Sequence, residues 1–171
     1  KITVNHFLEN EFSGKASHGL VRIVEAIKTM RKYGVPDKDP EIEFDNEQVL
    51  RLNANRQIGV VAAWHALEKG IQKAQNNALT FVGVRDYIAS SGALSFYLRR
   101  AAEEGYITLM GCNSVALVAP VGGKKRMLGT NPFGCGIPSS DGQHFIADFA
   151  TSAIAYGKVM VMKDKGQTVP E

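Results

Sequence analysis

Long apolar runs are missing from this sequence of 171 residues. No window of about 18 apolar residues exists, so no membrane-spanning helix is expected. The first residues, KITVNHFLENEFSG, lack the apolar core of a signal peptide. The densest basic cluster is GGKKR at 122–126, and the formal net charge is only +3, which argues against nucleic-acid binding. These absences favour a cytoplasmic protein without a membrane or nucleic-acid partner.

Cysteine and clustered metal ligands are scarce as well. Cys112 and Cys135 are the two cysteines, and their separation, without a CxxC motif, favours free thiols in a reducing compartment. No HExxH motif or grouped Cys/His set has the spacing of a metal site. His6, His65 and His144 stand alone in the sequence, and we interpret each as a surface or core-edge histidine.

Common nucleotide-binding motifs are absent too. There is no GxxxxGK[ST] loop for phosphates. The segment GCGIPSSDG at 134–142 resembles GxGxxG, but Pro138 stands where the helix would begin and Ser139 replaces the last glycine. No acidic residue follows at a strand end about 20 residues later. The sequence therefore does not predict a dinucleotide site of the usual βαβ type.

An alternation of apolar patterns is present, and it is typical of an α/β protein with a substantial core. The patterns predict five helices, over residues 3–12, 17–32, 57–75, 92–105 and 151–166. They also predict a hairpin with a turn at Asp45–Asn46. The predicted strands are the two of the hairpin, 41–45 and 49–55, and three others, 79–85, 106–114 and 144–150.

The spacing of these elements predicts how they pair. Strand, helix and strand over 79–114 form a βαβ unit with a parallel pair, whereas the hairpin needs an antiparallel pair. We therefore predict an α/β layered domain with a mixed β-sheet over 37–171, preceded by an N-terminal helical segment, 1–36. In that segment the apolar stripe of Leu20, Val24, Ile27 and Met30 is expected to be buried.

The segment SGKASHGLVRIV at 13–24 contains a candidate site. His18 and Arg22 lie four residues apart and would share one face of the predicted helix, with Ser17 as its N-cap. Arginine binds a carboxylate through its fork of donors, and histidine transfers protons near neutral pH. The alternative is that His18 is a neutral surface residue and Arg22 pairs with Glu25 or Glu9.

Two further segments place polar residues at strand ends. Asp148 lies near the end of a buried strand in IADFATSAIAYGK, just before a helix, where open α/β sheets bind ligands. The alternative for Asp148 is a helix-capping role. The segments CNS at 112–114 and GTNPFG at 129–134 suit a rigid loop that offers amide and hydroxyl groups to a ligand, or a plain turn.

Together, SHGLVR, GTNPFGCGIP and IADFATSAIAYGK resemble the SHG-x-x-R, GTNP and D-x-ATS-x-x-x-x-GK signatures of the malate/L-lactate dehydrogenase family. Their order and spacing agree across nearly the whole chain. The resemblance implies a nicotinamide-binding fold of non-Rossmann type. It also implies hydride transfer between NAD or NADP and a small 2-oxo or 2-hydroxy acid, or a cyclic imine, because the family includes sulfolactate, ureidoglycolate and diketogulonate enzymes and some cyclic-imine reductases.

Roles for individual residues follow from the same resemblance. The catalytic residues are expected to be His18 and Asp148. The substrate-binding residues are expected to be Ser17, Arg22, Asn113, Ser114 and Thr130. The cofactor-binding residues are expected to be Asn131, Pro132, Asp148, Phe149 and Ala150. A homodimer is implied as well, with the helix faces at 57–76 and 92–104 as candidate contacts.

Two departures from the family pattern stand out. The second histidine usual after the VR strand is replaced here by Ala89 or, with one inserted residue, by Ser90. Neither residue transfers a proton at neutral pH, so a catalytically impaired homologue with a binding or scaffold role is the alternative function. The chain also starts at Lys1 rather than methionine and is shorter than the family's members, so we expect it to be part of a longer protein.

Overall fold

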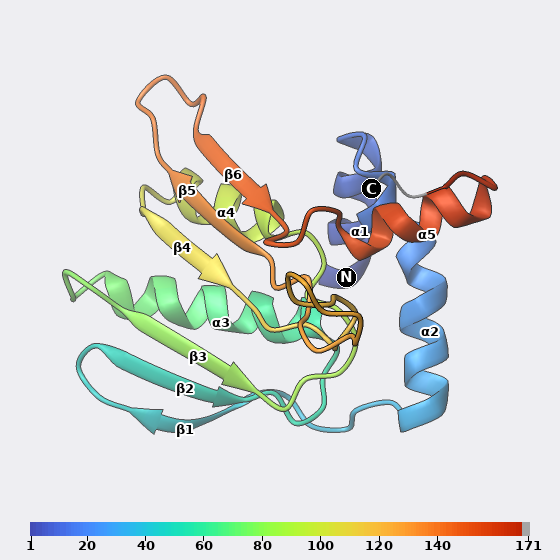
Figure 1. Ribbon diagram of the computed structural model, residues 1–171. Coiled ribbons are helices and arrows are strands. Elements are labelled where there is room, and N and C mark those ends of the chain that lie inside the picture. The colour runs from blue at the N-terminus through green and yellow to red at the C-terminus, as the bar shows by residue number, and fades with distance from the viewer. Residues whose placement is uncertain (169–171) are drawn as a thin grey trace. The chain divides into compact units, whose positions relative to one another are not determined.

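The computed structural model describes residues 1–168. The chain divides into two compact units, with the boundary along the sequence between Ala93 and Leu94. Each unit contains its own three-stranded sheet with helices (Figure 1). This arrangement is the mixed α/β architecture expected from the sequence. The functional division proposed at residues 36 and 37 stays a prediction.

The first unit consists of four helical segments and three strands. They are α1 (Ile2–Phe12), the 3-10 turn η1 (Ala16–His18), α2 (Val21–Tyr33), β1 (Glu41–Asp45), β2 (Val49–Asn53), α3 (Gly59–Ala74) and β3 (Phe81–Arg85). β1 and β2 form the predicted antiparallel hairpin, and β3 pairs in parallel with β2 after the crossover helix α3. The parallel pair predicted between 79–85 and 106–114 is therefore wrong, because the partner of β3 precedes it in the chain.

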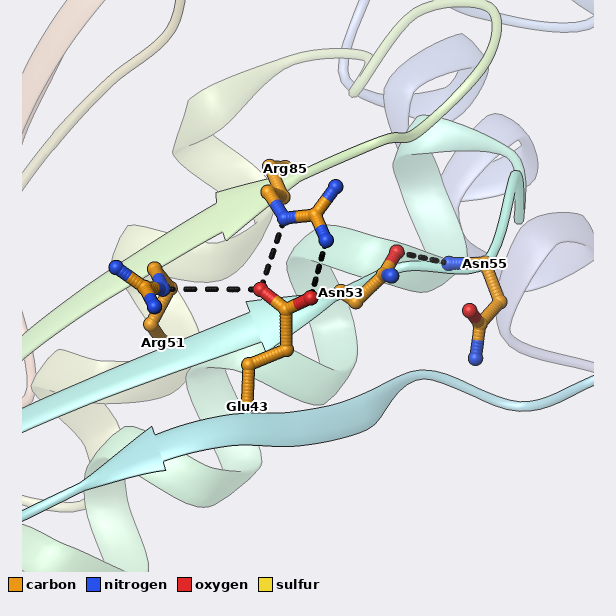
Figure 2. A network of polar contacts seen from close by, with 5 residues as sticks. All are labelled: Glu43, Arg51, Asn53, Asn55 and Arg85. Atoms are coloured by element: carbon orange, nitrogen blue, oxygen red, sulfur yellow. Dashed lines mark hydrogen bonds and ion pairs between the residues drawn. The ribbon is translucent and has the colours of Figure 1, made fainter.

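One face of this sheet forms the core of the first unit. Leu50 and Leu52 of β2 are buried, as are Val60 and Ala62 of α3. On the other face a charge network crosses all three strands (Figure 2). The Glu43 carboxylate of β1 accepts hydrogen bonds from Arg85, the one from Nε being 2.8 Å long, and lies 3.6 Å from Nε of Arg51. This face is therefore polar and suited to water.

The second helix of the first unit differs from its prediction. Instead of one helix over 17–32, the chain forms η1 and then, after Gly19, begins α2 at Val21. Glu11 accepts a hydrogen bond from the Leu20 N–H at 2.9 Å, so Ser17 is not the N-cap. The apolar stripe on α2 is exposed rather than buried, and Ala26 is the buried residue of this helix.

The second unit consists of two helices and three strands. They are α4 (Leu94–Glu103), β4 (Thr108–Gly111), β5 (Phe133–Ile137), β6 (Phe145–Phe149) and α5 (Tyr156–Asp164). The strand order is β4-β5-β6, and both pairs are antiparallel. β5 was not predicted as a strand, because its glycines Gly134 and Gly136 made the segment resemble a GxGxxG loop.

Helix α4 covers one face of the second sheet. Leu94, Tyr97 and Leu98 are almost completely buried. A Cβ atom on Gly136 of β5 would come within 2.7 Å of the carbonyl oxygen of Leu98, so glycine permits this close approach. The apolar face of α4 is therefore occupied within its own unit, whereas the role proposed for this helix in subunit contact stays a prediction.

Candidate functional site

Ser17 and His18 form the first part of the candidate site. The Ser17 hydroxyl lies 3.0 Å from Nδ1 of His18, and both side chains are partly buried in η1. The backbone N–H of His18 donates to the Lys15 carbonyl at 2.8 Å and closes the turn. This hydroxyl contact fixes the orientation of the imidazole ring, which a proton-transferring histidine requires.

Arg22 lies in the first turn of α2. His18 and Arg22 do not share a helix face as predicted, because η1 ends at His18 and the α-helix begins three residues later. The Arg22 side chain is 17% exposed, and its Nη1 forms an ion pair with Glu25. The alternative pairing of Arg22 with Glu25 is therefore confirmed for this structure.

A shallow pocket lies beside Arg22 within the first unit. Its polar lining comes from Arg22 and Glu25 of α2 and from Ser90 in the loop after β3, and Ala89 lies next to Ser90. The remainder of the lining consists of Gly92 and the apolar residues Phe7, Ala26, Ile58 and Val60. The structure thus brings Arg22 together with Ala89 and Ser90, the positions where the family pattern leads one to expect a second histidine. His18 is not among the residues that line this pocket.

His6 forms a hydrogen bond with the loop that contains Ala89 and Ser90. This histidine is fully buried in α1, and its Nε2 accepts a hydrogen bond from the Ala93 N–H at 3.2 Å. Gly92 has a φ of +76°, and a Cβ atom there would lie 2.0 Å from Nε2 of His6. Only glycine suits that conformation and that space. The sequence contained no signal for this contact, because it joins α1 to a loop far along the chain.

Three signature segments of the second unit meet at one end of its sheet. Gly111 at the end of β4 pairs with Phe133 at the start of β5, which pairs with Phe149 at the end of β6. The segments 112–114, 130–132 and 150–152 extend from these positions. The antiparallel register therefore gathers the residues that the sequence assigned to substrate and cofactor.

Hydrogen bonds hold these segments together. The Asn131 side-chain oxygen accepts from the Ser114 N–H at 3.0 Å. The Thr130 hydroxyl lies 3.4 Å from that of Ser114. The Thr151 hydroxyl lies 3.2 Å and 3.0 Å from the carbonyl oxygens of Thr130 and Asn131. A Cβ atom on Gly129 would come within 2.4 Å of the Ser114 carbonyl. The loop is therefore closely packed, as its Asn-Pro sequence indicated.

Asp148 lies on the face of β6 that is turned toward α4. One of its carboxylate oxygens accepts a hydrogen bond from the Ser95 N–H at 2.9 Å, in the first turn of that helix. This contact confirms the helix-capping alternative, since a carboxylate satisfies a helix N-terminus and opposes its dipole favourably. The next residue, Phe149, is exposed on the opposite face, and Ala150 is partly buried.

Within residues 1–168 no three His, Cys, Asp or Glu side chains lie together in a way that would hold a metal ion. In the same range no helix has both the length and the apolar character needed to cross a membrane.

Comparison with known sequences places the chain among characterised enzymes. A family model described as malate/L-lactate dehydrogenase matches residues 1–171. L-sulfolactate dehydrogenase from Methanothermobacter thermautotrophicus is 36% identical over 166 residues, which cover 96% of this chain and 48% of that protein. Malate dehydrogenase from Pyrococcus abyssi is 33% identical over 173 residues, covering 100% of this chain and 47% of that protein.

Solved structures with a similar fold carry names of the same kind. Malate dehydrogenase from Pyrococcus horikoshii OT3 has a TM-score of 0.87 and 29% identity, and the match covers 93% of this chain and 45% of that one. Delta1-piperideine-2-carboxylate reductase from Pseudomonas syringae pvar. tomato has a TM-score of 0.88 and 27% identity, over 99% of this chain and 51% of that one. The chain spans about half the length of the curated relatives that it matches.

Proposed function

Because the chain belongs to the malate/L-lactate dehydrogenase family, we propose that the protein transfers a hydride between NAD(P)H and a small 2-oxo acid, which yields the 2-hydroxy acid, and catalyses the reverse reaction. The observation that carries this proposal is the SHG-x-x-R segment, which keeps Ser17 in contact with His18 and places Arg22 beside a pocket. A purely structural segment would not need this combination. The names of the relatives favour an enzyme over a scaffold protein.

Arg22 is proposed to bind the substrate carboxylate. Among residues 1–168 its guanidinium bonds only to Glu25, through Nη1. Nε and Nη2 therefore remain able to form the paired, charge-assisted hydrogen bonds that carboxylates accept from arginine. His18, as the imidazolium, is proposed to donate its proton to the carbonyl oxygen during reduction and to accept it in the reverse direction. Ser17 is proposed to orient the ring.

The second unit is proposed to bind the nicotinamide nucleotide. The amides and hydroxyls of Asn113, Ser114 and Thr130 are proposed to contact the substrate. The cofactor residues are proposed to be Asn131, Pro132, Asp148, Phe149 and Ala150. These residues fit the group chemically, because neutral donors and acceptors suit a carboxamide and ribose hydroxyls, and the exposed Phe149 ring suits a flat heterocycle. When bound, the nicotinamide supplies or accepts the hydride.

Asp148 is proposed to have a catalytic role as well as its capping role. Its hydrogen bond to Ser95 supports the view that it first positions the start of α4 at the loop cluster. The choice between NAD and NADP is left open, and a cyclic imine is the second substrate candidate, favoured by the likeness to a piperideine-carboxylate reductase.

The protein is further proposed to be a cytoplasmic homodimer. Cys112 and Cys135 form no disulfide bond within residues 1–168, which supports a reducing compartment. Exposed apolar residues at the start of α2 and along it, Leu20, Val24 and Ile27, support contact with a second subunit.

The test is a fluorescence titration with NADH and NADPH, followed by addition of pyruvate, oxaloacetate or another small 2-oxo acid. We expect binding of one nucleotide and its oxidation. His18→Gln should abolish about 99% or more of turnover and leave nucleotide affinity unchanged, because general acid catalysis contributes roughly 10²–10⁴-fold. The matched control is His65→Gln on α3, which should retain full turnover. Absence of binding of both nucleotides would contradict the proposal.

A further inference from the structure

The pocket beside Arg22 contains one charge of each sign. Arg22 and Glu25 are the two charged residues that line it, and the rest of the lining is apolar or neutral. An exposed pair three residues apart on a helix is ordinarily worth only about 0.5 kcal/mol or less and has no further meaning. Here, however, the arginine is largely covered at 17% exposure, and its partner faces the same pocket at 53% exposure.

Both side chains keep unused hydrogen-bonding capacity. Within residues 1–168, the contact between Nη1 of Arg22 and Oε2 of Glu25 is the only hydrogen bond that either side chain makes. Arginine has five N–H donors and a carboxylate has two acceptor oxygens. The pair can therefore receive a ligand's carboxylate at the guanidinium and a ligand's N–H group at the carboxylate at the same time.

The charge of the ligand then decides how well it binds. A dicarboxylic acid carries two negative charges, and Arg22 can neutralise only one of them. The second carboxylate lies near Glu25, and like charges in a partly covered site repel each other. A zwitterionic acid brings a protonated nitrogen instead, which Glu25 attracts. Ala89 and Ser90, on the opposite loop, add no charge to alter this balance.

We propose that Glu25 is a specificity-determining residue. It makes the pocket select small acids with a protonated nitrogen next to the carboxylate, that is amino or imino acids, over dicarboxylic acids of the same size. This proposal deepens the proposed function and rests on it, since it names the charge of the substrate at the same arginine. It differs from a simple role for Glu25 in orienting Arg22, which would make all acids bind less tightly when Glu25 is replaced.

The experiment measures binding of L-proline, L-lactate and L-malate by calorimetry at low ionic strength and without nucleotide. We expect proline to bind wild-type protein about tenfold more tightly than malate, a difference of about 1.4 kcal/mol. Glu25→Gln should weaken proline and strengthen malate, each by several-fold, so that the order reverses. Arg22→Gln should weaken all three acids. The control, Glu68→Gln, replaces another exposed glutamate of the first unit and should change nothing.

Three outcomes would overturn the inference. These are no binding of any of the acids, malate binding at least as tightly as proline, and an unchanged order in Glu25→Gln. If Glu25→Gln does not fold, Glu25→Asp replaces it, since the shorter carboxylate should reduce the preference for proline in part. Failure of nucleotide binding together with the expected order of acids would reject the proposed function and leave the charge selectivity standing.

Discussion

The two three-stranded sheets differ in the face that each turns away from its packed helix. In the first unit that face carries Glu43, Arg51 and Arg85, one from each strand, joined in a charge network (Figure 2). In the second unit the register puts only apolar and glycine residues on the corresponding face. They are Leu109, Gly111, Phe133, Cys135, Ile137, Phe145, Ala147 and Phe149.

This difference in polarity decides whether each open face is suited to contact with water. An antiparallel or mixed sheet can face water when that face is polar, as in the first unit. The open face of the second sheet is apolar instead, since Leu109 on it is 69% exposed and Phe145 is 59% exposed. A contiguous apolar surface on a strand layer marks a site of interaction. The open face of the first sheet therefore carries charged side chains beside the exposed Phe81, whereas that of the second sheet carries none.

The largest expected effect is on the free energy of unfolding, and it differs between the two faces of the second sheet. Leu98 is a residue of α4 and is fully buried against β5, whereas Leu109 of β4 lies on the open face of the sheet. Leu98→Ala should lower the free energy of unfolding by about 2–5 kcal/mol, because it leaves a cavity. Leu109→Ala should change it by about 0.5 kcal/mol or less. Urea unfolding measures both, and equal losses would show that the open face is covered in solution.

The next effect concerns association rather than stability. Replacing Leu109 and Phe145 together by lysine should reduce binding of a hydrophobic dye and lower the apparent mass in light scattering, while unfolding changes by about 1 kcal/mol or less. The matched control is Phe81→Lys on the first sheet, where an exposed phenylalanine lies on the same face as Arg51 and Arg85. An equal change in association for the control and the double variant would show that the two sheets do not differ in their tendency to associate.

The smallest effect is the pH dependence of the charged face. The hydrogen bond from Arg85 is the main cause that lowers the pKa of Glu43 from its usual 4.5. A carboxyl whose pKa is lower in the folded chain stabilises the fold above its unfolded pKa and loses that contribution as the pH falls through the folded value. Because the pair lies on the open face of the sheet, where water screens the charges, the effect is small.

The measurement compares wild type with Glu43→Gln by urea unfolding from about pH 6 down to about pH 3. The wild type should be the more stable at the upper end, and the two curves should converge at the lower end. Glu47→Gln, at another exposed glutamate, should run parallel to wild type throughout. A constant difference between wild type and Glu43→Gln would show that the network contributes by packing rather than by charge.

Local patterns predicted much of the fold. The helix over 57–75 and the hairpin were correct, because their apolar periodicity matches one face of α3 and one face of β2. The prediction failed where a pattern had two meanings. The stripe on α2 is periodic but exposed. The glycines of β5, which allow α4 to approach, also made this strand resemble a glycine-rich loop.

The candidate site divides in the same way. The signatures around His18, Asn131 and Asp148 could be recognised because each is a short contiguous segment. The Arg22–Glu25 pair was also foreseeable, since residues three apart on a helix are neighbours. The burial of His6 against Gly92 could not be foreseen, because nothing local distinguishes it from a surface histidine.

The sequence by itself determined which short segments carry chemistry, which helices form, and to which family the chain belongs, because these depend on neighbouring residues. Only the tertiary structure decided that Ala89 and Ser90 line a pocket with Arg22, and that Asp148 caps a helix starting at Leu94. Such contacts depend on strand register and on the path of loops between distant segments. Those are set by how whole layers pack, and no local periodicity records them.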